Sequence, residues 1–149
     1  FTRATANGYE AMVGRLGERA KLTRDHARMW IDYVGLETPT ASIEGDADVI
    51  RLARDEIEAA VDSLGNDVSA AIDFHSAQET AAHVTRVLLA GPGSTIPGVA
   101  AQLQQRLAMQ VDVPAPLGAL DSTAIQGSGL DERRLTLAAG LALEEVAAL

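Results

Sequence analysis

Val87-Leu88-Leu89-Ala90-Gly91-Pro92-Gly93-Ser94-Thr95-Ile96-Pro97-Gly98 is the stretch around which the rest of the chain is organised. The short apolar run at its start is typical of a strand that is covered on both faces. Gly91 and Gly93 allow positive φ and the close approach of another group to the backbone. Ser94 and Thr95 stand where capping hydroxyls would lie, and Pro97 suits a first helical turn. The stretch predicts a strand, a tight loop and a helix.

A loop of this kind presents backbone N–H groups and a helix start, which suits a phosphate or a nucleotide. Two glycines alone favour an ordinary strand-to-helix turn, because short glycine motifs are frequent. The chain has no G-x-x-x-x-G-K-[ST] P-loop, and Ser94 lacks the G-x-S-x-G context of a serine nucleophile. The surroundings of the loop must therefore decide between the two interpretations.

Composition indicates a globular chain with an aliphatic core. Of 149 residues, 47% are hydrophobic, but there are only one Trp, two Tyr and two Phe. There is no cysteine, so disulfides, thiolate metal sites and thiol nucleophiles are excluded. The chain begins at Phe1 without an initiator Met or a signal peptide, and we expect it to be a piece of a longer parent.

The formal net charge of −9 makes a general nucleic-acid binder or a direct contact with anionic lipid improbable. No apolar run approaches the ~20 residues that span a bilayer. The three histidines share no spacing typical of a metal site. Spacing predicts a solvated acidic face for Asp62, Asp67 and Asp73, and core packing for Trp30.

Hydrophobic periodicity predicts three helices before the loop and an alternation of strands and helices from it onward. The third helix, from Asp46 or Asp48 to Gln78, is the longest, and Gly65 is the point where it could bend. Alternation of this kind is typical of a parallel α/β layer. The predicted segments are a strand end at 1–4, helices at 8–21, 24–34 (capped by Thr23) and 46–78, a strand at 83–90, a helix at 97–108, a strand at 109–113, a loop at 117–129 and a helix at 131–148.

Several stretches in this order resemble the C-terminal half of the PilM family, the actin-like proteins of type IV pilus assembly. They are the segment 22–36 (LTRDHARMWIDYVGL), the end of the long helix at 71–78 (AIDFHSAQ), the loop at 87–99 and the closing Gly140-Leu141-Ala142-Leu143. The family is similar to the division protein FtsA and belongs to the actin, Hsp70 and sugar-kinase superfamily. The resemblance covers nearly the whole chain.

The resemblance implies an α/β fold, the ribonuclease H-like fold of actin-like ATPases. The chain would be a fragment of lobe II with a long helix and a small parallel or mixed sheet. Residues 1–8 and 83–149 would form subdomain IIA, incomplete at its N-terminus, and residues 9–82 the helical subdomain IIB.

The resemblance also implies that the glycine loop is the adenosine motif. Gly91, Gly93 and Ser94 would border the adenine and ribose of ATP, although Pro92 stands where relatives often have another glycine. Many relatives place a Lys or Glu of the second helix against the adenosine, and here only Arg24 or Arg28, one turn apart, could substitute. We take Arg28 as the candidate.

The phosphate hairpins, the catalytic acid and most of the Mg²⁺ site of such proteins would precede Phe1. This segment alone would therefore not be catalytic, and hydrolysis by the full-length parent stays open. The implied partner is the N-terminal peptide of a PilN-like membrane protein, with self-association as a further prospect. The implied location is cytoplasmic, peripheral to the inner membrane through partners. Two alternatives are an FtsA-like division protein and a small-molecule kinase of the same superfamily. The chain's acidic end, Glu144-Glu145, disfavours an FtsA-type membrane anchor.

Overall fold

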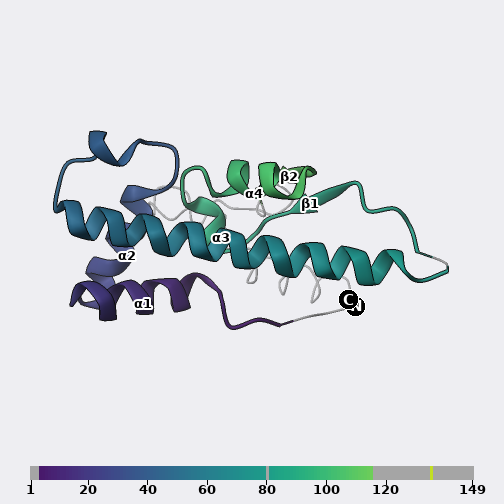
Figure 1. Ribbon diagram of the computed structural model, residues 1–149, viewed down its shortest axis with the longest axis horizontal. Coiled ribbons are helices and arrows are strands. Elements are labelled where there is room, and N and C mark those ends of the chain that lie inside the picture. Colours follow the sequence, from purple (N-terminus) through teal and green to yellow (C-terminus); the bar gives the residue numbers. More distant parts are fainter. Residues whose placement is uncertain (1–3, 80, 116–134, 136–149) are drawn as a thin grey trace, which may run out of the picture.

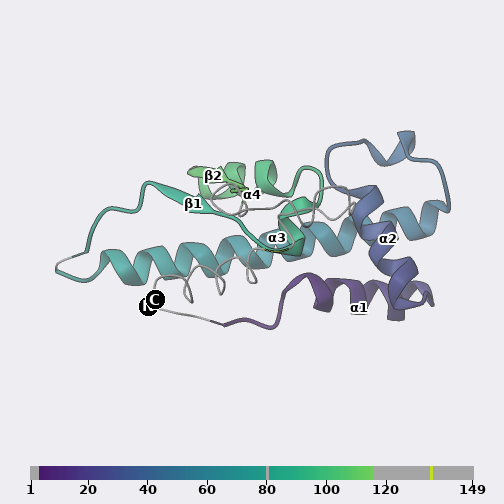
Figure 2. The same ribbon diagram turned by 180° about the vertical axis from the view of Figure 1, so that it is seen from behind.

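Helix α3 (Ala47–Ser76) is the element along which the other described helices pack (Figures 1 and 2). The computed structural model describes residues 4–79, 81–115 and 135. Asp46 caps α3 by accepting hydrogen bonds from the N–H groups of Asp48 and Val49. Of the two predicted caps, Asp46 and Asp48, it is therefore Asp46 that caps the helix. The helix is continuous for 30 residues, so Gly65 does not interrupt it. Gly65 is buried, and a Cβ there would collide with the side chain of Arg106, so glycine allows a close approach at this point.

Helices α1 (Tyr9–Ala20) and α2 (Arg24–Val34) pack against each other and against the first half of α3. The sequence predicted both helices within one residue at each end. Thr23 caps α2 by accepting from the N–H of His26, and Gly35 ends the helix at φ 47°, as predicted. Aliphatic side chains from the three helices fill the core between them, among them Val13, Leu16, Ile31, Val34, Ile57 and Val61.

One buried carboxylate ties α1 to α3. Glu56 of α3 is 5% exposed and accepts from Arg15 Nε at 2.7 Å and from Arg19 Nη1 at 2.5 Å. Burial alone would raise the pKa of Glu56, but the hydrogen bonds and charges of the two guanidiniums outweigh it and lower the pKa below its usual value. The carboxylate is therefore charged and paired at neutral pH.

The second layer lies along the other side of α3 and contains β1 (Arg86–Leu88), the short 3₁₀ turn η2 (Pro92–Thr95), α4 (Val99–Leu107) and β2 (Gln110–Asp112). The strands are parallel, with Val87 opposite Val111, which confirms the predicted parallel α/β arrangement. Among the described residues the protein is thus mixed α/β, mostly helical, with a small two-stranded parallel sheet.

Three predictions around β1 and α4 were wrong in detail. The strand is three residues long rather than 83–90, and its two faces are not both covered, because Leu88 is 56% exposed. Helix α4 begins at Val99 and not at Pro97, because Gly98 enters it in the left-handed conformation (φ 82°). Neither Ser94 nor Thr95 caps that helix, since their hydroxyls bond to carbonyls inside η2.

The end of α2 is joined to the segment before α4. The N–H of Leu36 donates to the carbonyl of Pro97 at 2.7 Å, and a Cβ at Gly35 would collide with Pro97. The 36–45 segment is a loop, as predicted, and contains a 3₁₀ turn, η1 (Thr40–Ser42). The end of α2 is therefore in direct contact with the segment that links the glycine loop to α4.

The predicted strand end at 1–4 is absent at Ala4, and residues 1–3 lie outside the described part. The predicted loop at 117–129 and, apart from residue 135, the predicted helix at 131–148 also lie outside it. Within the described residues, none of the helices is both long and apolar enough for a membrane crossing.

Asp62, predicted on a solvated face, pairs with Arg106 of α4 at 3.0 Å and is still 61% exposed. Trp30 is partly buried against the core, in line with its predicted packing role.

Candidate functional site

The glycine loop is held in shape by its own hydrogen bonds. Gly91 has φ 94°, a conformation that favours glycine, and it starts the 3₁₀ turn η2. The carbonyl of Gly91 accepts both the N–H of Ser94 at 3.0 Å and the Ser94 hydroxyl at 2.7 Å. Ser94 is buried, so its hydroxyl proton is committed to the loop and only the oxygen lone pairs remain for a ligand.

A cavity of about 360 Å³ opens beside this loop. That volume is at the lower end of the roughly 300–1,000 Å³ found for small-molecule sites. Its walls come from three regions that are distant in sequence, the last of which includes both the loop and the start of α4. They are Thr5, Asn7, Gly8, Tyr9 and Met12 at the start of α1; Ile57, Ala60, Val61 and Leu64 on α3; Leu89, Ala90, Pro92, Gly93 and Ser94 around the loop; and Ile96 and Val99 at the start of α4.

Among the residues that the structure describes, no Lys, Arg, Asp or Glu lines the cavity. The lining is mostly aliphatic, and a few polar side chains stand at its edges. An uncharged, flat or apolar group fits such a space, whereas a phosphate or a metal ion would find no opposite charge among these residues. The described residues also contain no group of three or more His, Asp or Glu placed to hold a metal ion.

Gly93, like Gly91, has open space in front of it. A Cβ built there meets nothing within 4 Å, and its φ lies outside the range that demands glycine. Neither packing nor backbone strain therefore explains a glycine at this position. Its lack of a side chain leaves the backbone open to the cavity.

The structure brings together two of the four predicted site residues, Gly93 and Ser94, which both line the cavity. Gly91 does not line it and acts through the turn that it starts. Arg28 does not line it either. Its guanidinium pairs with Glu10 at 3.0 Å and with Asp25 at 3.3 Å. The hydrogen bond that it donates to the Glu10 carboxylate raises the pKa of Arg28 above its usual value.

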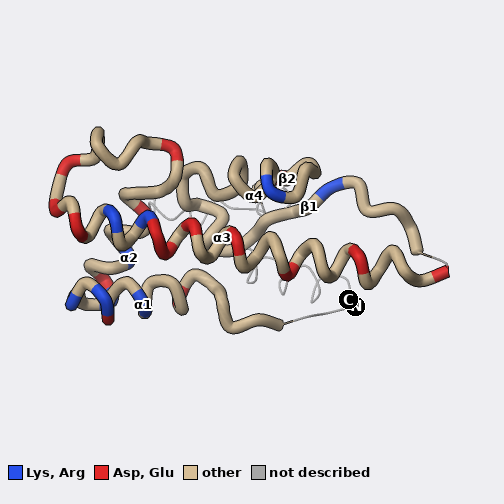
Figure 3. Tube along the Cα trace, in the orientation of Figure 1, with Lys and Arg blue, Asp and Glu red and all other residues tan. Residues whose placement is uncertain are grey.

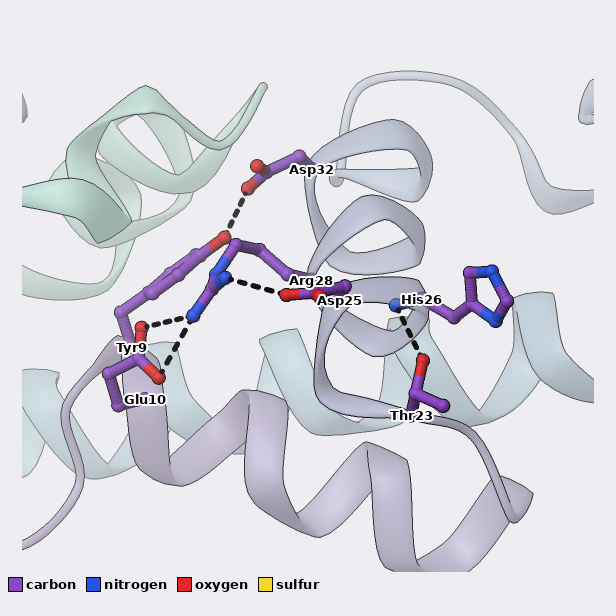
Figure 4. Close-up of polar contacts among 7 residues, drawn as sticks. All are labelled: Tyr9, Glu10, Thr23, Asp25, His26, Arg28 and Asp32. Carbon is purple, nitrogen blue, oxygen red and sulfur yellow. Dashed lines mark hydrogen bonds and ion pairs between the residues drawn. The ribbon is translucent and has the colours of Figure 1, made fainter.

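Tyr9 connects the cavity wall with the surroundings of Arg28 (Figure 4). Its ring lines the cavity, and its hydroxyl donates to Asp32 of α2 at 2.8 Å. Arg28 lies beside this ring on its way to Glu10 (Figure 4). Arg28 therefore pairs with Glu10, which follows Tyr9 in the chain, and does not itself line the cavity.

Sequence reasoning missed Tyr9 and Asn7 as site residues. Asn7 lines the cavity and donates to Ser63 of α3 at 2.8 Å, which fastens the segment before α1 across the long helix. Gly8 was interpreted only as a helix start. No local signal links residues 5–9 with residues 89–94, because only the packing of both against α3 makes them neighbours.

Comparison with known families decides the relationship. The profile of the type IV pilus assembly protein PilM matches residues 53–146, which is more than half of the chain. The chain belongs to the PilM family. This confirms the resemblance seen in the sequence. No curated protein matches the chain.

The PilM match begins inside α3 and includes the glycine loop, α4 and both strands, so Gly91, Gly93 and Ser94 lie within it. Helices α1 and α2, and with them Tyr9 and Arg28, lie before the matched range. The aliphatic α3 wall and the loop wall of the cavity are therefore PilM-family parts, and the wall at the start of α1 is contributed by residues outside the match.

Proposed function

We propose that this chain supplies the base and ribose side of an ATP site in an actin-like scaffold of the type IV pilus assembly platform. The observation that carries the proposal is Gly93, whose open backbone faces an uncharged cavity of about 360 Å³. A nucleobase is flat and uncharged and gains mainly from apolar contact, which the walls from α3 and α4 offer. Membership of the PilM family associates the chain with pilus assembly.

The phosphates would lie outside this cavity, because the described residues of its lining include no cation to receive them. In this proposal the phosphates and Mg²⁺ are held mainly by the N-terminal half of the parent protein, as in the actin-like proteins that the sequence resembles. The chain itself then contributes no catalytic residue and binds ATP only weakly when isolated. Arg28 makes no direct contact with the nucleotide in this proposal, because it pairs with Glu10 and Asp25 and does not line the cavity.

The remaining parts of the proposal rest on the family alone. The parent would act on the cytoplasmic side of the inner membrane and would reach the membrane through the N-terminal peptide of a PilN-like protein. Self-association belongs to the same expectation. We assign no residue of this chain to either contact.

Binding of a fluorescent ATP analogue to the full-length parent, measured by anisotropy, tests the nucleotide site. Gly93→Val places a branched side chain in the open space, and we expect at least about tenfold weaker binding, or a loss of 1.4 kcal/mol or more. Ala101→Val adds similar bulk on the exposed side of α4 and serves as the control. Unchanged binding by Gly93→Val, with the protein still folded, would return the loop to the status of an ordinary turn.

The platform assignment is tested separately. The full-length parent is mixed with an N-terminal peptide of a PilN-type protein, and binding is measured by calorimetry. A parent that binds nucleotide and ignores this peptide would refute the partner while leaving the nucleotide site intact.

A further inference from the structure

The outer face of α2 carries large apolar side chains. Met29 and Tyr33 are 57% and 55% exposed, and residues four apart lie side by side on a helix. The ring of Trp30 meets that of Tyr33 edge-on, with centroids 5.9 Å apart and planes at 64°. Met29, Trp30 and Tyr33 are called the α2 patch below.

The α2 patch stands on a rigid base. The indole of Trp30 lies so close to Gly45, in the loop before α3, that a Cβ at that glycine would collide with it. The opposite side of α2 is fixed by the fully buried Ala27 and Ile31. A surface that is held in place before binding loses little conformational entropy when a partner covers it.

Exposed acidic side chains lie beside the α2 patch. Asp25 is 92% exposed, and Glu44 precedes Gly45, on which Trp30 rests. Figure 3 shows further acidic positions along the loop from α2 to α3. Arg28 pairs with Glu10 of α1 at 3.0 Å and with Asp25 at 3.3 Å, and the Arg24 guanidinium lies over Gly14 of α1. The pair with Asp25 is exposed to solvent and contributes little, so Asp25 can exchange Arg28 for a cation of a partner. The surroundings of the patch therefore favour a positively charged ligand.

The size and charge of the patch limit what can cover it. A standard stable interface buries about 800 Å² on each partner, far more than two half-exposed side chains and one ring provide. A second copy of this chain would bring another net charge of −9, and an anionic lipid surface would also be repelled. A short segment that carries both apolar and basic side chains meets neither obstacle.

We propose that the α2 patch docks a short, cationic amphipathic helix of a partner protein. Apolar side chains on one face of that helix would pack on Met29, Trp30 and Tyr33, and lysine or arginine beside them would face Asp25 and Glu44. Aromatic residues and methionine are enriched in protein interfaces, and an aromatic anchor in a desolvated centre carries much of the binding energy. The site is separate from the cavity beside the glycine loop and independent of nucleotide.

Trp30 is the one tryptophan of the chain, so its fluorescence reports on the patch directly. The probe is a synthetic Leu/Lys peptide of about 14 residues, four helical turns, without aromatic residues. Titration into the 149-residue chain is expected to shift the Trp30 emission and to saturate. We expect the double variant Met29→Ser/Tyr33→Ser to bind at least about tenfold more weakly. Leu88→Ser, at an equally exposed apolar position on β1, is the matched control and is expected to bind like the wild type.

Circular dichroism shows that each variant is folded before its titration is compared. Absence of saturable binding by the wild type would overturn the proposal, as would equal weakening by Leu88→Ser. A Leu/Glu peptide of the same pattern that binds as well as the Leu/Lys peptide would refute the role of charge. Two further results would replace the proposed occupant: a dimer in sedimentation velocity that the double variant abolishes, or binding to phosphatidylglycerol vesicles that it abolishes.

Discussion

Glu56 offers the sharpest test of how the helices are held together. Glu56→Gln keeps the shape of the side chain but removes the charge that Arg15 and Arg19 share, and it turns one acceptor into an NH₂ donor. A hydrogen bond to a charged group contributes about 1.5–3 kcal/mol. Because the two arginine side chains are 39% and 47% exposed, solvent screens part of this. We expect a loss of about 2 kcal/mol, or roughly 4–8 °C in Tm for a chain of this size.

The dependence of this loss on pH follows from the lowered pKa of Glu56. A carboxylate with a lower pKa in the folded state stabilises the fold fully above its unfolded pKa, near 4.3. The stabilisation disappears as pH falls through the folded value. The difference between wild type and Glu56→Gln is therefore expected to be complete at neutral pH and to shrink in acid.

Thermal unfolding followed by circular dichroism, at neutral and acidic pH, measures both effects. Glu58→Gln, on the exposed side of the same helix, is the control and is expected to change stability by less than about 0.5 kcal/mol. If Glu56→Gln destabilises no more than Glu58→Gln at neutral pH, the buried ion pair does not hold α1 to α3.

Two further predictions concern the backbone, and both are checked by urea unfolding. Asp46→Ala removes the cap of α3 and is expected to cost about 1 kcal/mol, whereas Asp46→Asn, which retains an acceptor, is expected to cost little; equal effects of the two would rule out capping. Gly98→Ala places a Cβ on a residue whose φ is 82°, and this Cβ would lie 3.0 Å from the backbone N of Glu37. We expect the free energy of unfolding to fall by at least about 1–2 kcal/mol. Gly93→Ala, with open space around it, is expected to stay within about 0.5 kcal/mol, and a larger loss there would show that Gly93 is structural.

Local patterns predicted the helices well because the physics that they report is local. Thr23 and Gly35 mark the ends of α2, and the three- and four-residue spacing of aliphatic side chains marks α3. The start of α4 was misjudged because Pro97 is an equally good residue for a loop, and the left-handed conformation of Gly98 sets the boundary. The strand was overestimated because an apolar run does not reveal how much of it finds a pairing partner.

By itself the sequence determined the order of the described helices and strands, the cap of α2, the glycine loop and the relationship to the PilM family, and it narrowed the cap of α3 to Asp46 or Asp48. Only the tertiary structure decided that Gly93 and Ser94 share a cavity with Tyr9 and Asn7, and that Arg28 pairs with Glu10 instead of lining this cavity. It also decided that Gly65 serves close packing rather than a bend. The physical reason is that capping and periodicity act within a few residues, whereas a cavity is defined by side chains that come together only when their helices pack against α3.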